Sequence, residues 1–186
     1  MRFYLKLTSL FIFSSYLLTS LSSDSSFYLN YASKNWFSKI DVSSTILGKG
    51  ELKFLGFRVY EIALIGPETI NSQNVFESDF ALTIKYSRNL KKTQIAKSSK
   101  KEISKLGFRK KDELDSWFRW MVENFVDVNK GDTLTGLYKR NFGIILYHND
   151  KKISEKKDVE FAKAFFSIWL AKKTSRPRLR DSLFGK

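Results

Sequence analysis

The amino-acid sequence predicts an α+β fold, in which an antiparallel sheet carries helices on one side. Three observations support this prediction: strand-like segments at 47–65 and 80–87, helix-like segments at 93–125, and a strand meander followed by a last helix at 133–170. Runs of strands separated by runs of helices are typical of α+β domains rather than of parallel sheets. No repeat or glycine-serine tract interrupts residues 23–186, so we expect one domain there.

The first 22 residues have the layout of a signal peptide. Arg2 and Lys6 precede an uncharged apolar run at 7–21, and small residues around Ser22 offer a cleavage point. The run is shorter than the roughly 20 residues that a spanning helix needs, which favours cleavage over an uncleaved membrane anchor, the alternative. We therefore expect export, with the periplasm as the destination, and a folded domain formed by residues 23–186.

Composition excludes several kinds of site. The chain has no cysteine and a single histidine, which excludes disulfides and thiol nucleophiles and argues against zinc, so we expect neither a metal nor another cofactor. Its formal net charge is +14, and such a surface attracts nucleic acid, anionic lipid or acidic small molecules. Export argues against nucleic acid. A solvated basic surface and an anionic membrane surface remain as interpretations.

The first two strand-like segments alternate. In 47–65, valine, isoleucine and aromatic residues cluster, and the glycines fit bulges or bends. Strict alternation places Phe54, Arg58 and Tyr60 on one face and Lys53 on the other. The segment 80–87 alternates in the same way and predicts a second strand region.

The remaining elements follow from helical spacing and from end signals. Segment 93–106 has one apolar stripe and stops at Gly107, and 112–125 repeats apolar residues at spacings of three and four. Strands are then expected at 133–139, at 144–147 and near Ile153. A final helix begins after Asp158, a good N-cap, and Pro177 opens a last short helical turn.

The order and spacing of five segments resemble the chalcone isomerase-like family, in particular its secreted bacterial branch. The segments are GKGELKFLGFRVY, FALTIKYSRNL, WFRWM, FVDVNKGDTLTGLY and FAKAFFSIWL with its TSRP continuation. The resemblance covers nearly all of the chain after the leader. It implies an open-faced β-sandwich, a large antiparallel sheet covered by helices, with a ligand cleft between the two layers.

The resemblance does not supply a matched catalytic set. Enzymes of the family use an arginine, a threonine and a tyrosine. By alignment, Leu55 stands in the threonine's place, Ser43 lies near the arginine's place, and the tyrosine's place falls near Ile95. The arginine of the bacterial and fatty-acid-binding pattern is replaced by Leu52. Because leucine and isoleucine supply no donor for a developing negative charge, we expect a protein that does not catalyse.

Candidate ligand-binding residues lie on the two strand regions that should border the cleft. They are Lys53, Phe54, Arg58, Tyr60, Lys85 and Tyr86. Arg58 and Tyr60 beside Phe54 would hold a carboxylate whose tail lies in an apolar trough. Alternatively, the charged residues are surface groups and Tyr60 is a core aromatic residue.

The resemblance therefore implies a secreted, non-catalytic protein that binds a small apolar molecule with an anionic group, such as a fatty acid. Two alternatives remain. One is an isomerase, an intramolecular lyase that uses Arg58, Lys85 and Tyr60 in a non-standard set. The other is a basic envelope module without a small ligand, held to an anionic membrane by its charge.

Overall fold

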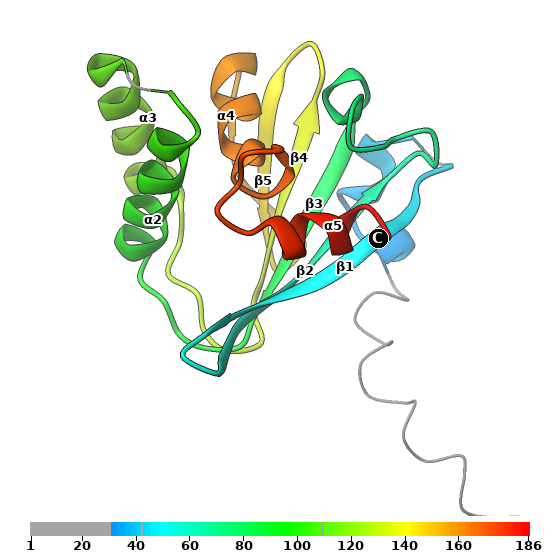
Figure 1. Ribbon diagram of the computed structural model, residues 1–186, viewed down its shortest axis with the longest axis horizontal. Helices are drawn as coiled ribbons and strands as arrows, with labels where there is room; N and C mark the ends of the chain where they lie inside the picture. The colour runs from blue at the N-terminus through cyan, green and yellow to red at the C-terminus, as the bar shows by residue number, and fades with distance from the viewer. Residues whose placement is uncertain (1–30, 42, 109) are drawn as a thin grey trace, which may run out of the picture.

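The computed structural model describes residues 31–41, 43–108 and 110–186 of the chain (Figure 1). The predicted signal peptide, 1–22, therefore lies outside the described residues. The fold is one six-stranded antiparallel sheet whose strands follow one another in sequence order. The strands are β1 Thr45–Phe54, β2 Phe57–Gly66, β3 Phe80–Tyr86, β4 Thr133–Lys139, β5 Gly143–His148 and β6 Lys151–Lys156.

Four α-helices lie on one side of this sheet (Figure 1). They are α2 Lys92–Lys105, α3 Lys111–Asn124, α4 Val159–Leu170 and α5 Pro177–Leu183. Helix α4 packs on β4 and β5, α5 packs on β1, and α2 packs on both α3 and α4. The α+β class and the antiparallel sheet covered by helices, as predicted from the sequence, are confirmed.

The core is divided by the sheet. Its larger part, between the sheet and the helices, includes Phe80, Phe161 and Phe166, all fully buried. The smaller part, on the other face, packs Trp36 and neighbouring residues against the sheet. Short 3-10 helices complete the described chain: η1 Tyr31–Ser33, η2 Phe37–Lys39 and η3 Val75–Glu77.

The start of α4 matches its sequence signal. The Asp158 carboxylate accepts a hydrogen bond from the Phe161 backbone N–H at 2.9 Å, which caps the helix. The same carboxylate accepts a bond from the Trp117 indole at 3.2 Å, so the cap also ties α3 to α4.

The β1–β2 hairpin has a tight turn and a bulge. Leu55 and Gly56 form the turn, with φ angles of 50° and 81°, the left-handed region that type I′ hairpin turns require. In the register, Leu52 faces Tyr60 but Lys53 faces Arg58, so Val59 is an extra residue on β2. This bulge reverses the alternation of β2 between Arg58 and Tyr60.

Candidate functional site

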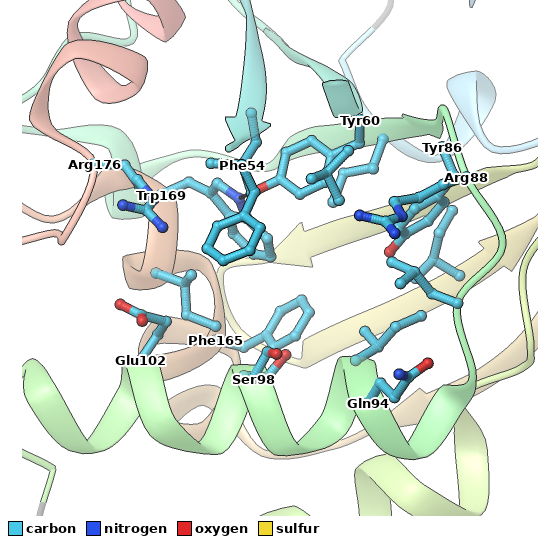
Figure 2. Close-up of a pocket in the computed structure, with 18 residues that line it drawn as sticks. Phe54, Tyr60, Tyr86, Arg88, Gln94, Ser98, Glu102, Phe165, Trp169 and Arg176 are labelled. Carbon is cyan, nitrogen blue, oxygen red and sulfur yellow. Dashed lines mark hydrogen bonds between the residues drawn. The ribbon is translucent and has the colours of Figure 1, made fainter. Parts of the chain in front are cut away.

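A cavity of about 340 Å³ lies between the helical face of the sheet and helices α2 and α4 (Figure 2). Its size is at the lower end of the roughly 300–1,000 Å³ typical of small-molecule sites. Strands β1 to β4 supply its floor, and α2 and α4 supply its walls. It therefore lies between the two layers, where the family resemblance implies a ligand cleft.

Apolar side chains make most of the lining. Ile84, Leu134 and Phe165, each about 5% exposed, form buried parts of it. Leu52 and Ile95 also line it. These are two of the positions where the family resemblance implies hydrocarbon instead of a catalytic donor. An apolar ligand body would replace water along this surface.

Tyr60 supplies one polar group to the cavity. The Trp169 indole donates a hydrogen bond to the Tyr60 hydroxyl oxygen at 2.9 Å, which orients the phenol. Burial raises the pKa of Tyr60 to about 12, so the phenol keeps its proton at neutral pH. Because the Tyr60 oxygen accepts this bond, the hydrogen of its O–H group remains available for donation to a ligand.

Tyr86 supplies a second hydroxyl, and its side chain is 4% exposed. Its ring packs edge-on against Tyr60, with centroids 6.1 Å apart. Burial raises the pKa of Tyr86 above the usual value for a phenol, and its hydroxyl has no hydrogen bond to any other described residue. A hydroxyl that has no protein partner and opens to a cavity is suited to donate to a bound acceptor.

Two arginines stand at opposite ends of the cavity. Arg88, just beyond β3, lies at the end with Tyr86 and Gln94, and Arg176, just before α5, lies at the end with Glu102 (Figure 2). Both arginines reach solvent.

The two ends differ in charge. Partial burial acts to raise the pKa of Glu102, but hydrogen bonds from Lys105 and Ser175 and the charges of Lys105 and Arg176 lower it overall. Glu102 is therefore a carboxylate that partly neutralises the Arg176 end. It is the one acidic residue among the described lining residues, so the Arg88 end is the more favourable place for an anion.

Of the six residues predicted from the sequence, the structure brings three to the cavity: Phe54, Tyr60 and Tyr86. Lys53, Arg58 and Lys85 do not line it. The structure therefore does not bring these three side chains together with the aromatic residues of the cavity.

Arg58 is displaced by the hairpin bulge. Because Val59 is inserted, Arg58 lies on the face of Glu51 and Glu61 and not on that of Tyr60. Its Nε lies 2.8 Å from a Glu51 carboxylate oxygen, and its guanidinium also pairs with Glu61. The prediction that Arg58 shares a face with Tyr60 assumed uninterrupted alternation.

The two lysines lie on that same face. Lys53 forms an ion pair with Glu51. Lys85 is the register partner of Glu61, one residue away from Ile84 and Tyr86, so its side chain leaves the sheet on the side opposite to theirs.

Two of the aligned catalytic positions are also not at the cavity. Leu55 lies in the exposed hairpin turn. Ser43 is exposed and donates hydrogen bonds to Asp41.

Sequence reasoning missed Arg88, Gln94 and Arg176. Arg88 carries a usable signal, because the alternation of Ile84 and Tyr86 continues to it. Arg176 stands in a loop before a proline, where no periodicity applies.

Two kinds of site are not found in the described part of the chain. Residues 31–41, 43–108 and 110–186 contain no group of three or more histidine, cysteine, aspartate or glutamate residues placed to hold a metal ion. Within the same ranges, no helix has the length and apolar character needed to cross a membrane.

Comparisons with known proteins agree with the fold. The crystal structure of a fatty-acid binding protein of Arabidopsis thaliana superposes with a TM-score of 0.59 at 12% identity, covering 78% of this chain and 88% of that one. An uncharacterized protein of Haemophilus influenzae is 29% identical over 140 residues, which are 75% of this chain and 67% of the relative. A family model described as chalcone isomerase-like matches residues 46–185. The chain therefore belongs to the chalcone isomerase-like family.

Proposed function

We propose that this protein binds, without catalysis, a small molecule with an apolar body and an anionic group in the cavity between sheet and helices. A fatty acid is the leading candidate. The observation that carries the proposal is an apolar cavity lined by two neutral tyrosine side chains, with Arg88 at the end that lacks an acidic residue. The structural similarity to a protein named for fatty-acid binding supports the same ligand class.

In the proposed complex the carboxylate lies at the Arg88 end. The guanidinium supplies charge, and the Tyr86 hydroxyl and the Gln94 amide supply further donors. The hydrocarbon tail lies against Phe165 and Ile168. Because the cavity is small for its class, affinity should fall when the chain outgrows it.

Displacement of a fluorescent fatty acid tests this placement. Tyr86→Phe and Arg88→Gln should each weaken binding on the order of tenfold, as expected for one lost hydrogen bond to a charged group. Lys85→Gln, on the opposite face, should leave affinity unchanged. Equal affinities for the wild type and the two cavity variants would refute the placement.

An isomerase remains the second candidate because the structure adds a donor that the alignment lacked. Arg88 and Tyr86 at one end of the cavity could together stabilise a developing enolate. A chalcone cyclisation assay separates the two candidates. We expect no turnover above the uncatalysed rate, and cyclisation that Arg88→Gln abolishes would replace the binding proposal with the enzymatic one.

We also propose that the protein is exported to the periplasm after removal of residues 1–22. The basic start and the short apolar run support this. N-terminal sequencing of the protein from a fractionated bacterial host should give Ser23 as the first residue, and retention of Met1 in a membrane fraction would indicate the uncleaved anchor instead.

A further inference from the structure

We propose that the β1–β2 hairpin docks onto an anionic lipid bilayer through Phe54, Leu55 and Phe57, here called the apolar tip. These side chains are 58%, 80% and 73% exposed, and they are the large hydrophobic residues found exposed in the described part of the chain. Single exposed apolar residues are ordinary, but three in one turn form a patch that fits an apolar partner.

The turn conformation argues that Leu55 has a role outside folding. Its φ of 50° lies in the left-handed region, which costs conformational energy for a leucine and favours asparagine or glycine. Its side chain also gains no burial within the protein. A strained residue that stays exposed is explained by contact with an apolar environment beyond the chain.

The surroundings of the tip are positive. Segments 87–92 and 127–132 lie beside the hairpin, since Ser87 N–H donates to the Val59 carbonyl at 2.9 Å and Gly131 N–H donates to the Tyr86 carbonyl at 2.8 Å. Together with the hairpin segment 51–61, they carry six lysines and arginines and four acidic residues, a net charge of +2. Glu51 pairs with Lys53 and Arg58, and Asp127 pairs with Lys91. Cations around an apolar protrusion match the headgroup layer of an anionic bilayer above its acyl chains.

The positive charge around the apolar tip also distinguishes between possible binding partners. A second copy docking through the same surface would bring two positive ends together, which like-charge repulsion opposes. A nucleic acid would satisfy the cations but would leave the apolar tip in water. An anionic bilayer satisfies both features.

Docking would bring the cavity mouth to the bilayer, because Phe54 belongs both to the apolar tip and to the cavity lining. An acyl chain could then pass between bilayer and cavity without crossing water. This last step depends on the proposed function, whereas the docking itself does not.

The chain contains no cysteine, so single labelled positions can test the docking. Phe57→Cys carries an environment-sensitive fluorophore at the tip. Phe142→Cys carries the same fluorophore in the turn after β4, which the register places at the opposite end of the sheet. Full-length protein is mixed with vesicles of phosphatidylglycerol and phosphatidylcholine, or of phosphatidylcholine alone. Neither measurement requires a ligand in the cavity.

We expect the label at position 57 to shift to the blue on anionic vesicles, less in high salt and less on neutral vesicles, while the label at position 142 stays in water. Adding Leu55→Asn should weaken vesicle binding by on the order of tenfold, because one leucine side chain no longer enters the bilayer. The same substitution should not lower the thermal midpoint of unfolding. A chain anchored only by its apolar run at 7–21 would shift neither label and would overturn the proposal. A shift at position 57 that arises from self-association without vesicles would overturn it as well.

Discussion

At the scale of single residues, the chemistry of the cavity depends on two phenols that keep their protons. Tyr86 is buried and Tyr60 is partly buried beside it, and desolvation raises the pKa of both. As neutral hydroxyls they donate hydrogen bonds and cannot act as bases at neutral pH. This state suits recognition of an anion, and it leaves the charge itself to Arg88.

The raised pKa of Tyr60, about 12, predicts a loss of stability in alkali. An unfolded tyrosine titrates near 10, so above that pH the folded state holds more protons than the unfolded state. The free energy of unfolding should therefore fall as pH rises from about 10 through about 12. Urea denaturation of the wild type and Tyr60→Phe across this range checks the prediction, since the variant should show a shallower decline. An identical decline would mean that Tyr60 titrates normally in the folded protein.

Most substitutions lower the stability of a protein, but we expect a substitution of Leu55 to raise it. Replacing it by asparagine relieves left-handed strain at φ 50° and completes an Asn-Gly turn with Gly56. We expect Leu55→Asn to stabilise the fold by ~1 kcal/mol. Chemical denaturation measures this, and a destabilised variant would show that the leucine packs within the protein.

At the scale of elements, periodicity in the sequence predicted the helices and strands well. The stripes at 93–106 and 112–125 correspond to α2 and α3, and the alternation at 80–87 corresponds to β3. Pro177 opens α5 as expected. These signals are strong because each element buries one face over many residues.

The same reasoning failed for the charged part of the site. A single inserted residue, Val59, has no signature of its own in a run of β-formers, yet it moves Arg58 to the other face. Arg176 lies in a loop beyond the end of α4, where no periodicity predicts which way a side chain points, whereas Arg88 continues the alternation of β3. The aromatic part of the site was predictable because Tyr60 and Tyr86 follow the apolar face of their strands.

The attachment of α5 to the sheet depends on Gly48. A Cβ added there would lie 2.2 Å from the Ser182 carbonyl oxygen and 2.6 Å from the Leu183 carbonyl carbon, both backbone atoms. Gly48→Ala should therefore displace α5 and cost ~1–3 kcal/mol of stability, as overpacking does. Gly50→Ala, which meets the movable Leu179 side chain, should cost less in the same denaturation experiment. Equal stabilities of wild type and Gly48→Ala would contradict this close packing.

At the scale of the whole molecule, one side of the sheet and one end of it carry the proposed functions. The helical side encloses the cavity, and the hairpin end exposes the apolar tip among cations. The opposite side of the sheet is partly covered by the chain around Trp36. This arrangement is compatible with both proposals at once, because the cavity can hold an apolar anion while the hairpin contacts a lipid surface.

The central claim is that the cavity holds the ligand, and native mass spectrometry of protein purified without refolding tests it most directly. Ser98 of α2 lines the cavity and is exposed, so the large side chain of Ser98→Trp should occlude the cavity. Neighbouring Lys97 is also exposed but does not line the cavity, so Lys97→Trp serves as the control. After incubation with a fatty acid, the wild type and Lys97→Trp should carry one acyl mass and Ser98→Trp should carry none. A wild type that stays empty, or a Ser98→Trp variant that keeps the ligand, would contradict the account.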